Sequence, residues 1–203
     1  MFDLALRPVK DRALGPAADV LAPRLGALPI TAVSLVSCVA AGLLAGVGAS
    51  RWAVVLWLFG RAADGLDGLV ARRRGSASDL GGYLDMLADT VGYAAVPLGV
   101  AVGAGDEGVW TTCAVLLASF YVNALSWTYL SALLEKRGTG VATSGEATSI
   151  RMPVGLVEGA ETIVLLTVVL AWPASAAWVF ALMALLVGLT VLQRARWAWR
   201  ALR

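Results

Sequence analysis

The chain has 203 residues, of which 59% are hydrophobic and 15% are charged, and its formal net charge at neutral pH is +2. An average soluble domain carries about 25% charged residues. The composition therefore leaves too little polar surface for a water-soluble fold and predicts that much of the surface faces lipid. The lack of histidine excludes imidazole catalysis and histidine-ligated metals. Cys38 and Cys113 lie in separate apolar stretches, and we expect buried thiols without a disulfide.

Residues 1–28 mix charged and apolar side chains, so they do not have the uninterrupted apolar core of a cleavable signal peptide. Apolar side chains recur there at near-helical spacing, with Pro8 and Pro16 placed where they would bend a helix. We predict a short amphipathic helix that lies on the membrane surface, with a disordered tail as the alternative.

Beyond this interfacial segment, the chain alternates between apolar stretches and short polar connections. A membrane-spanning helix needs about 20 residues to cross about 30 Å of hydrocarbon. Six stretches are long enough, at 29–48, 52–72, 79–103, 109–134, 153–172 and 175–196. We therefore predict an all-α, polytopic membrane protein with one domain over 1–203, made of the interfacial segment, a six-helix bundle over 29–196 and a tail over 197–203.

Basic residues predict the orientation of this bundle. They precede the first span, occupy 72–74 and 136–151, and follow the sixth span, whereas the opposite connections hold a single basic residue, Arg51. Under the positive-inside rule both termini are cytoplasmic, which requires an even number of spans. We expect a multi-pass protein of the cell (inner or plasma) membrane.

The unusual feature is acid within apolar helices. The second span holds Asp64 and Asp67, the third holds Asp85 and Asp89, and the fifth holds Glu158 and Glu161. Each ionised residue at bilayer depth costs about 2.5–3.5 kcal/mol on insertion scales, and such residues usually mark functional sites. A polar contact between helices is the alternative for one lone acid. Four acids at helical spacing beside one cytoplasmic connection favour a site instead.

The spacing places these acids on two helix faces. Asp64 and Asp67 share one face, and Gly81, Asp85 and Asp89 share another at i, i+4 and i+8. Because the connection between the two spans is short, we expect the helices to be antiparallel neighbours with their acidic faces opposed. Crowded carboxylates repel unless cations neutralise them, and oxygen ligands select hard cations such as Mg²⁺, Mn²⁺ or Ca²⁺. Such cations bind phosphate oxygens, so the pattern predicts phosphoryl-type transfer.

The same stretch resembles the signature of the CDP-alcohol phosphotransferase family. Residues 64–72 read Asp-Gly-Leu-Asp-Gly-Leu-Val-Ala-Arg, and after eight intervening residues Gly81 begins the second half. All eight fixed positions of that signature are present, namely Asp64, Asp67, Gly68, Ala71, Arg72, Gly81, Asp85 and Asp89. Stretches at 81–99 and 155–162 are similar to a poorly characterised bacterial subgroup of the family.

The resemblance implies the reaction and its participants. It implies transfer of a phosphatidyl-type group from a CDP-linked lipid, such as CDP-diacylglycerol, to a small alcohol with release of CMP, in phospholipid biosynthesis at the cytoplasmic face. It further implies two Mg²⁺ or Mn²⁺ ions and a homodimer, and no nucleic-acid partner is expected.

The resemblance also implies roles for individual residues. Asp64, Asp67 and Asp85 would bind the metal ions, and Asp89, counted with these metal-binding carboxylates, would be the general base. Gly68, Ala71, Arg72 and Gly81 would flank the CDP group. An interfacial cation is the alternative for Arg72, and Arg73 and Arg74 are interpreted as topology determinants.

The acceptor is not encoded in the signature. Glu158, Glu161 and Arg151 are the candidate acceptor-binding residues, although the two glutamates could instead pair with Arg61 or Arg151. Serine, a polyol, an inositol phosphate and a glycerol phosphate all stay open. At 30–34 the chain departs from the Pro-Asn-x-x-Thr-like segment common in the family and keeps only a hydroxyl, at Ser34, so this stretch is left out of the site.

A cation transporter is the alternative from another functional class, because intramembrane acids also mark ion pathways. Transporter sites lie near the bilayer midplane, often at helices broken by glycine or proline. Here the four aspartates cluster beside one cytoplasmic connection, which favours the enzyme.

Overall fold

The computed structural model describes residues 3–138 and 159–203, and within these ranges the chain forms helices and no strand. The all-α prediction is confirmed. The helices are α1 (Asp3–Leu21), α2 (Ala27–Gly46), α3 (Ser50–Arg74), α4 (Asp79–Ala104), α5 (Glu107–Lys136), α7 (Gly159–Ala171), the 3₁₀ turn η1 (Pro173–Ser175) and α8 (Ala176–Ala201).

The helix ends follow local sequence signals. Glycines in the left-handed region, Gly48 (φ 77°), Gly75 (φ 61°) and Gly105 (φ 60°), lie in the turns after α2, α3 and α4. The Asp106 carboxylate accepts a hydrogen bond from the Val109 amide at 2.9 Å and caps α5. The described helices therefore begin and end within a few residues of the predicted spans; residues 153–158 of the predicted fifth span lie outside the described ranges.

Four described stretches are long and apolar enough to cross a membrane: α2, α4, α5 and the continuous segment of η1 and α8. The helix α3 is long enough but carries three charged residues in its interior, Arg61, Asp64 and Asp67, and three arginines in its last turn. The described part of α7 has 13 residues. The membrane class is thus supported, and the count of six spans stays a prediction.

A helix is present at the N-terminus, where α1 runs without a break past Pro16. It packs against α3 and buries Ala18 completely. The guanidinium of Arg73 donates to the Gly15 carbonyl and pairs with Asp19 at 2.8 Å, and Arg74 donates to the Ala22 carbonyl. The end of α3 therefore holds α1 in place. The location of α1 at a membrane surface stays a prediction.

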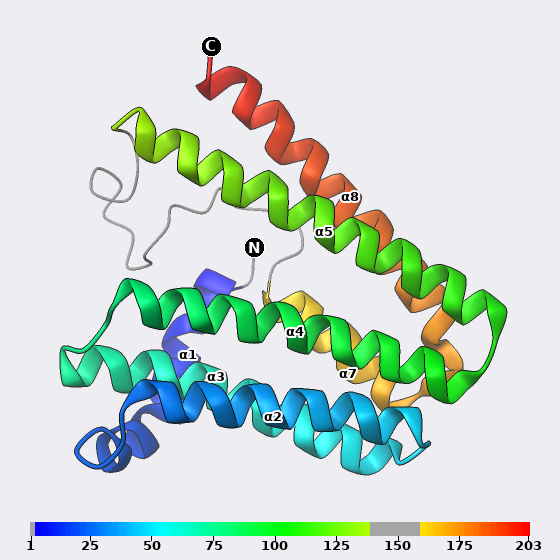
Figure 1. Ribbon diagram of the computed structural model, residues 1–203, viewed down its shortest axis with the longest axis horizontal. Helices are drawn as coiled ribbons and strands as arrows, with labels where there is room; N and C mark the ends of the chain where they lie inside the picture. The colour runs from blue at the N-terminus through cyan, green and yellow to red at the C-terminus, as the bar shows by residue number, and fades with distance from the viewer. Residues whose placement is uncertain (1–2, 139–158) are drawn as a thin grey trace.

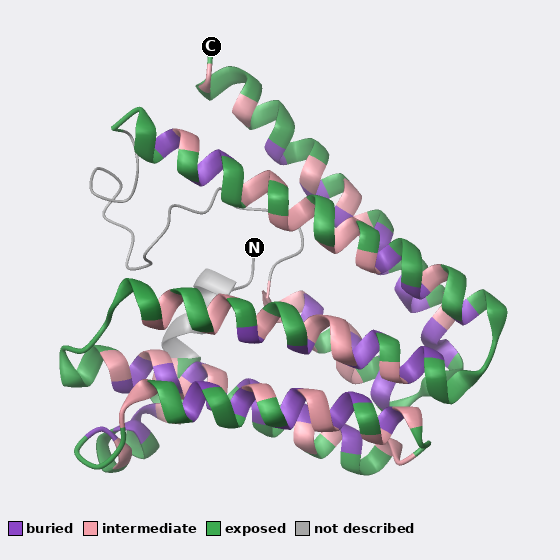
Figure 2. Ribbon diagram, viewed as in Figure 1, coloured by how far each residue is buried: buried purple, intermediate pink, exposed green. Residues whose placement is uncertain are grey.

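The helices form two groups (Figure 1). The helix α2 packs closely against both α3 and α4, with α7 against α3, while α5 and α8 form a second pair that diverges from the first group towards the C-terminus. Buried residues lie inside the first group and where the two groups meet, and exposed residues cover the outer faces (Figure 2). Many of these exposed residues are large and hydrophobic, as expected for a surface that faces lipid.

One prediction about this packing is wrong in detail. The helices α3 and α4 are antiparallel, but their backbones are not close neighbours, because α2 lies against both. Side chains such as Trp57 and Tyr93 still meet between them. The reason for the separation of the backbones is the close approach of α2 and α4 at small residues. A Cβ atom on Gly99 would lie 1.9 Å from the carbonyl oxygen of Gly42, so only glycine fits there. The aspartates of α3 and α4 therefore lie near one another, although the two helix backbones do not pack closely.

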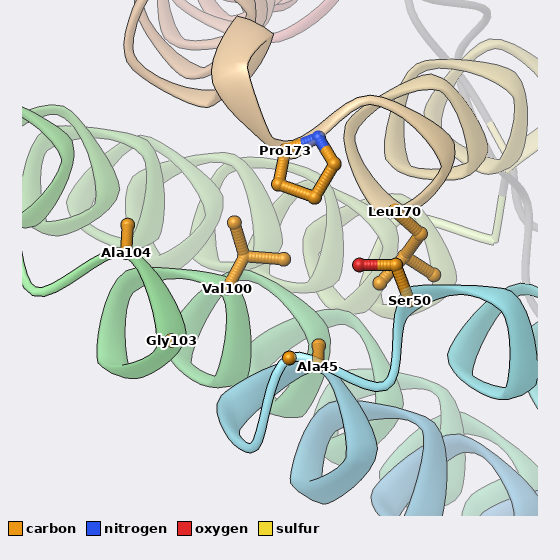
Figure 3. A pocket seen from close by; sticks show the side chains of 8 residues that line it. Ala45, Ser50, Val100, Gly103, Ala104, Leu170 and Pro173 are labelled. Carbon is orange, nitrogen blue, oxygen red and sulfur yellow. The ribbon is translucent and has the colours of Figure 1, made fainter.

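A small pocket lies at the opposite end of α3 and α4 from the aspartates (Figure 3). It is lined by Ala45, Gly48, Ser50, Val100, Gly103, Ala104, Leu170 and Pro173. The Ser50 hydroxyl is its only polar side-chain group. This pocket offers no charge to a diphosphate and is not a candidate for the active site.

Candidate active site

The candidate site is built where α3 ends and α4 begins. After Gly75 the chain turns within four residues, and the Ser78 hydroxyl caps α4 by accepting a hydrogen bond from the Gly81 amide at 3.2 Å. This short connection holds the C-terminal half of α3 and the N-terminal half of α4 at one end of the bundle. The four aspartates of the signature all belong to these two half-helices.

The structure brings the four carboxylates together. Each of Asp64, Asp67, Asp85 and Asp89 lies close enough to the other three to interact with them electrostatically. Asp67 is buried, and the other three are half-buried. The predicted convergence of the two acidic faces is therefore present, although α3 and α4 are not tightly packed.

Two of these carboxylates have partners on neighbouring helices. The Thr31 hydroxyl of α2 donates to Asp67 Oδ2 at 2.6 Å, and Arg61 Nη1 of α3 donates to Asp89 Oδ1 at 2.5 Å. Asp85 Oδ1 is buried and has no hydrogen-bond partner in the described part of the chain. A buried carboxylate oxygen without a partner is costly and is a ready position for a cation.

The donor set fits a hard divalent metal. Within residues 3–138 and 159–203, no three carboxylates are arranged to hold one ion as they stand. Thr31 and Arg61 engage Asp67 and Asp89. Even so, the cluster offers only oxygen ligands, and Asp85 Oδ1 is free of any such contact. Oxygen-only donor sets are those of Mg²⁺ and Mn²⁺.

A lysine from α1 also lies beside the cluster. The side chain of Lys10 runs over Gly65, where an added Cβ would lie 2.1 Å from Lys10 Cε and 2.9 Å from its Nζ. Its charge acts on both Asp64 and Asp67. The glycine between the first two aspartates therefore makes room for α1 and its cation, a use that the signature does not reveal.

The residues predicted to flank CDP lie around the same end of the bundle. Gly68, Ala71 and Gly81 are half-buried, and Arg72 is exposed. The Arg72 guanidinium lies 4.0 Å from the Asp11 carboxylate, and its Nη1 would be 3.2 Å from a Cβ atom on Gly68. Arg72 therefore lies at the surface beside Gly68, and its contact with a ligand phosphate stays a prediction.

The predicted acceptor residues are less well defined. Glu161 is half-buried in the first turn of α7, whereas Glu158 and Arg151 lie outside the described residues. Arg61 pairs with Asp89 in the third span, which is not the partner that we considered for it among the glutamates of the fifth span. Arg61 therefore belongs to the aspartate cluster.

The sequence reasoning missed three contributors, Thr31, Ser34 and Arg61. Thr31 and Ser34 lie in the stretch that departs from the family pattern, yet Thr31 donates to Asp67, and Ser34 accepts a hydrogen bond from Arg61 Nη2 at 3.3 Å. Arg61 and Asp64 are three residues apart on one helix face. A lone arginine at that spacing from an intramembrane acid is the signal that could have found Arg61.

Comparisons with known proteins agree with the signature. A family model described as CDP-alcohol phosphatidyltransferase matches residues 23–192. Inner membrane protein YnjF of Escherichia coli (strain K12) is 37% identical over 127 residues, which are 60% of this chain and 58% of YnjF. A phosphatidylinositol phosphate synthase of Cutibacterium acnes is 36% identical over 103 residues, 47% of this chain and 46% of that protein. The matched region thus spans less than two thirds of either relative.

Solved structures share the fold. The crystal structure of Mycobacterium tuberculosis phosphatidylinositol phosphate synthase (PgsA1) with CDP-DAG bound superposes with a TM-score of 0.70 at 24% identity, covering 93% of this chain and 94% of that chain. The crystal structure of the same synthase in complex with manganese and citrate gives a TM-score of 0.70, covering 92% and 88%.

Proposed function

Since the chain belongs to the CDP-alcohol phosphatidyltransferase family, we propose that it transfers a phosphatidyl-type group from a CDP-linked lipid, such as CDP-diacylglycerol, to an alcohol and releases CMP. The observation that carries this proposal is the convergence of four mutually interacting carboxylates from α3 and α4, with Asp85 Oδ1 buried and unpartnered. The PgsA1 structures with CDP-DAG and with manganese support both the donor class and the metal class.

The chemistry divides between binding and proton transfer. Asp64, Asp67 and Asp85 would hold the divalent metal, which when bound supplies positive charge for the diphosphate and for the departing CMP. The acceptor oxygen forms a bond to the lipid-bearing phosphorus as the bond from that phosphorus to the CMP oxygen breaks. Asp89 takes the proton of the acceptor hydroxyl, because an alcohol is a poor nucleophile until it is deprotonated.

Two positively charged side chains near the aspartates suggest which class of acceptor the site would bind. Lys10 and the exposed Arg72 lie at the same end of the bundle as the aspartates. These cations would suit an acceptor that carries a phosphate, and the named relatives include phosphatidylinositol phosphate synthases. Inositol phosphate and glycerol phosphate are therefore the first acceptors to assay, with serine and a neutral polyol beside them.

We expect CMP release from CDP-diacylglycerol to require a divalent metal. Excess chelator should abolish the release in the presence of the preferred acceptor, and Mn²⁺ or Mg²⁺ should restore it, because four carboxylates cannot bind a diphosphate without cations. The measurement is CMP production by purified protein across the acceptor panel. Full activity in excess chelator would contradict the metal proposal, and no CMP with any acceptor would contradict the proposed function.

We further infer a single domain with six spans, both termini in the cytoplasm, and a homodimer. Glu107 and Lys136 lie at the two ends of the 30-residue helix α5, so the topology places them on opposite sides of the membrane. Glu107→Cys is expected to react with an impermeant maleimide from outside the cell, and Lys136→Cys only after permeabilisation. The native thiols Cys38 and Cys113 are buried, so they give a low background. Labelling of both positions from the same side would rule out this arrangement.

A further inference from the structure

Arg61 is a buried cation in the interior of α3, three residues before Asp64. Its side chain is 5% exposed. An arginine within an apolar helix is retained only where its charge has partners or a function. It does not belong to the eight signature positions, and its surroundings show what it does.

The guanidinium of Arg61 connects three helices. Nη1 donates to Asp89 Oδ1 of α4 at 2.5 Å, while Nη2 donates to the Ser34 hydroxyl at 3.3 Å and to the Cys38 sulfur at 3.2 Å, both on α2. Because the backbones of α3 and α4 are not close neighbours, this ion pair is a direct polar link between the two halves of the site.

Two aromatic rings fix the guanidinium further. Its central carbon lies 5.0 Å from the ring centroid of Trp57 and 5.2 Å from that of Tyr93, which is the range of a cation–π contact. The two rings meet edge to face at 6.0 Å, and Trp57 Nε1 donates to the Thr167 hydroxyl of α7 at 3.1 Å. A planar guanidinium in contact with two rings and held by three hydrogen bonds has little freedom to rotate.

A proton acceptor works only if it points at the proton that it removes. Arg61 engages Oδ1 of Asp89 and leaves Oδ2 outside this ion pair. We propose that Arg61 is the positioning residue of Asp89: it fixes the rotamer of this carboxylate and reserves one oxygen for the acceptor hydroxyl. The inference rests on the proposed function, in which Asp89 is the base.

A purely structural clamp between α2, α3 and α4 is the competing explanation. The two differ in their effect on metal binding. Arg61 places a positive charge beside the carboxylates that would hold the cations, and it occupies an oxygen of one of them. Removal of a positioning cation should therefore make divalent metal bind more tightly while turnover falls. Removal of a clamp should weaken both.

The test compares Arg61→Met and Arg61→Lys with Arg194→Met. Arg194 is the control because it is also a buried arginine that links helices, donating to Asn123 at 2.8 Å and Ser126 at 2.7 Å, but it lies between α5 and α8. Each variant is assayed for kcat and KM of CMP release, for Mn²⁺ affinity by electron paramagnetic resonance of the free ion, and for thermal unfolding.

For Arg61→Met, we expect kcat to fall about 10–100-fold, as for loss of a partner that orients a site residue, with KM for the CDP-lipid little changed and Mn²⁺ bound several-fold more tightly. Arg61→Lys keeps the charge but cannot span all three partners, so we expect Mn²⁺ affinity near that of the parent and partial recovery of kcat. Arg194→Met should lower the unfolding temperature and leave Mn²⁺ affinity unchanged.

The proposal is overturned if Arg61→Met keeps kcat within a few-fold of the parent, or if its Mn²⁺ affinity falls together with its stability. If Arg61→Met does not fold, Arg61→Lys decides, since kcat equal to that of the parent would refute positioning. If the parent releases no CMP with any acceptor, the proposed function fails. The Mn²⁺ comparison then decides alone: tighter binding by Arg61→Met supports the placement of Arg61 against Asp89, and equal or weaker binding refutes it.

Discussion

Asp89→Asn is expected to lower the turnover of CMP release by about 10²–10⁴-fold, the usual effect of losing a general base. The amide has nearly the same shape as the carboxylate but cannot take the proton of the acceptor. The affinity for CDP-lipid should stay close to that of the parent, because binding of the diphosphate is assigned to the other three aspartates. Steady-state kinetics of CMP release and calorimetric binding of CDP-lipid, run on the same preparations, measure the two effects separately.

Asp67→Asn gives the opposite pattern and serves as the comparison. Here we expect a raised KM and weaker CDP-lipid binding, because one carboxylate fewer is left to hold the cation that binds the diphosphate. Asp79→Asn is the matched control, since Asp79 is an exposed carboxylate in the first turn of α4, outside the cluster. If Asp89→Asn turns over within a few-fold of the parent while Asp79→Asn is also normal, Asp89 is not the base.

Gly99→Ala is expected to be the most destabilising single-methyl change in the described part of the bundle. Its Cβ would lie 1.9 Å from the Gly42 carbonyl oxygen and 2.6 Å from the carbonyl carbon, so the backbones of α2 and α4 would have to separate. Overpacking typically costs about 1–3 kcal/mol. Because the obstacle here is backbone, we expect a loss at the upper end of this range or above it, measured as thermal or denaturant unfolding in detergent.

Gly188→Ala is the control for this change. Gly188 lies within α8, and nothing lies within 4 Å of an added Cβ atom there. Alanine favours the interior of a helix by about 0.8–1.0 kcal/mol over glycine, so this variant should be neutral or slightly more stable. Equal stability of the two variants would contradict the close packing of α2 and α4.

The placement of the four aspartates could be predicted from the sequence because it depends on local geometry. Helical periodicity alone puts Asp64 with Asp67 and Asp85 with Asp89, and the turn at Gly75 brings both pairs to one end of the bundle. These are short-range relations, and the structure agrees with them. The hydrogen-bond partners of the carboxylates could not be predicted, because Thr31 and Arg61 lie 36 and 28 residues from the acids that they contact.

The helical structure, the membrane class and the cluster of acids follow from composition and periodicity, which depend only on the residues and their spacing. The packing of α2 against both acidic helices, and the approach of Lys10 on α1 to Gly65, depend on the three-dimensional arrangement of the helices. The same arrangement determines which of several acids Arg61 pairs with. Helix neighbours are selected by steric fit at residues such as Gly42 and Gly99, and ion pairs by the distances that this packing leaves.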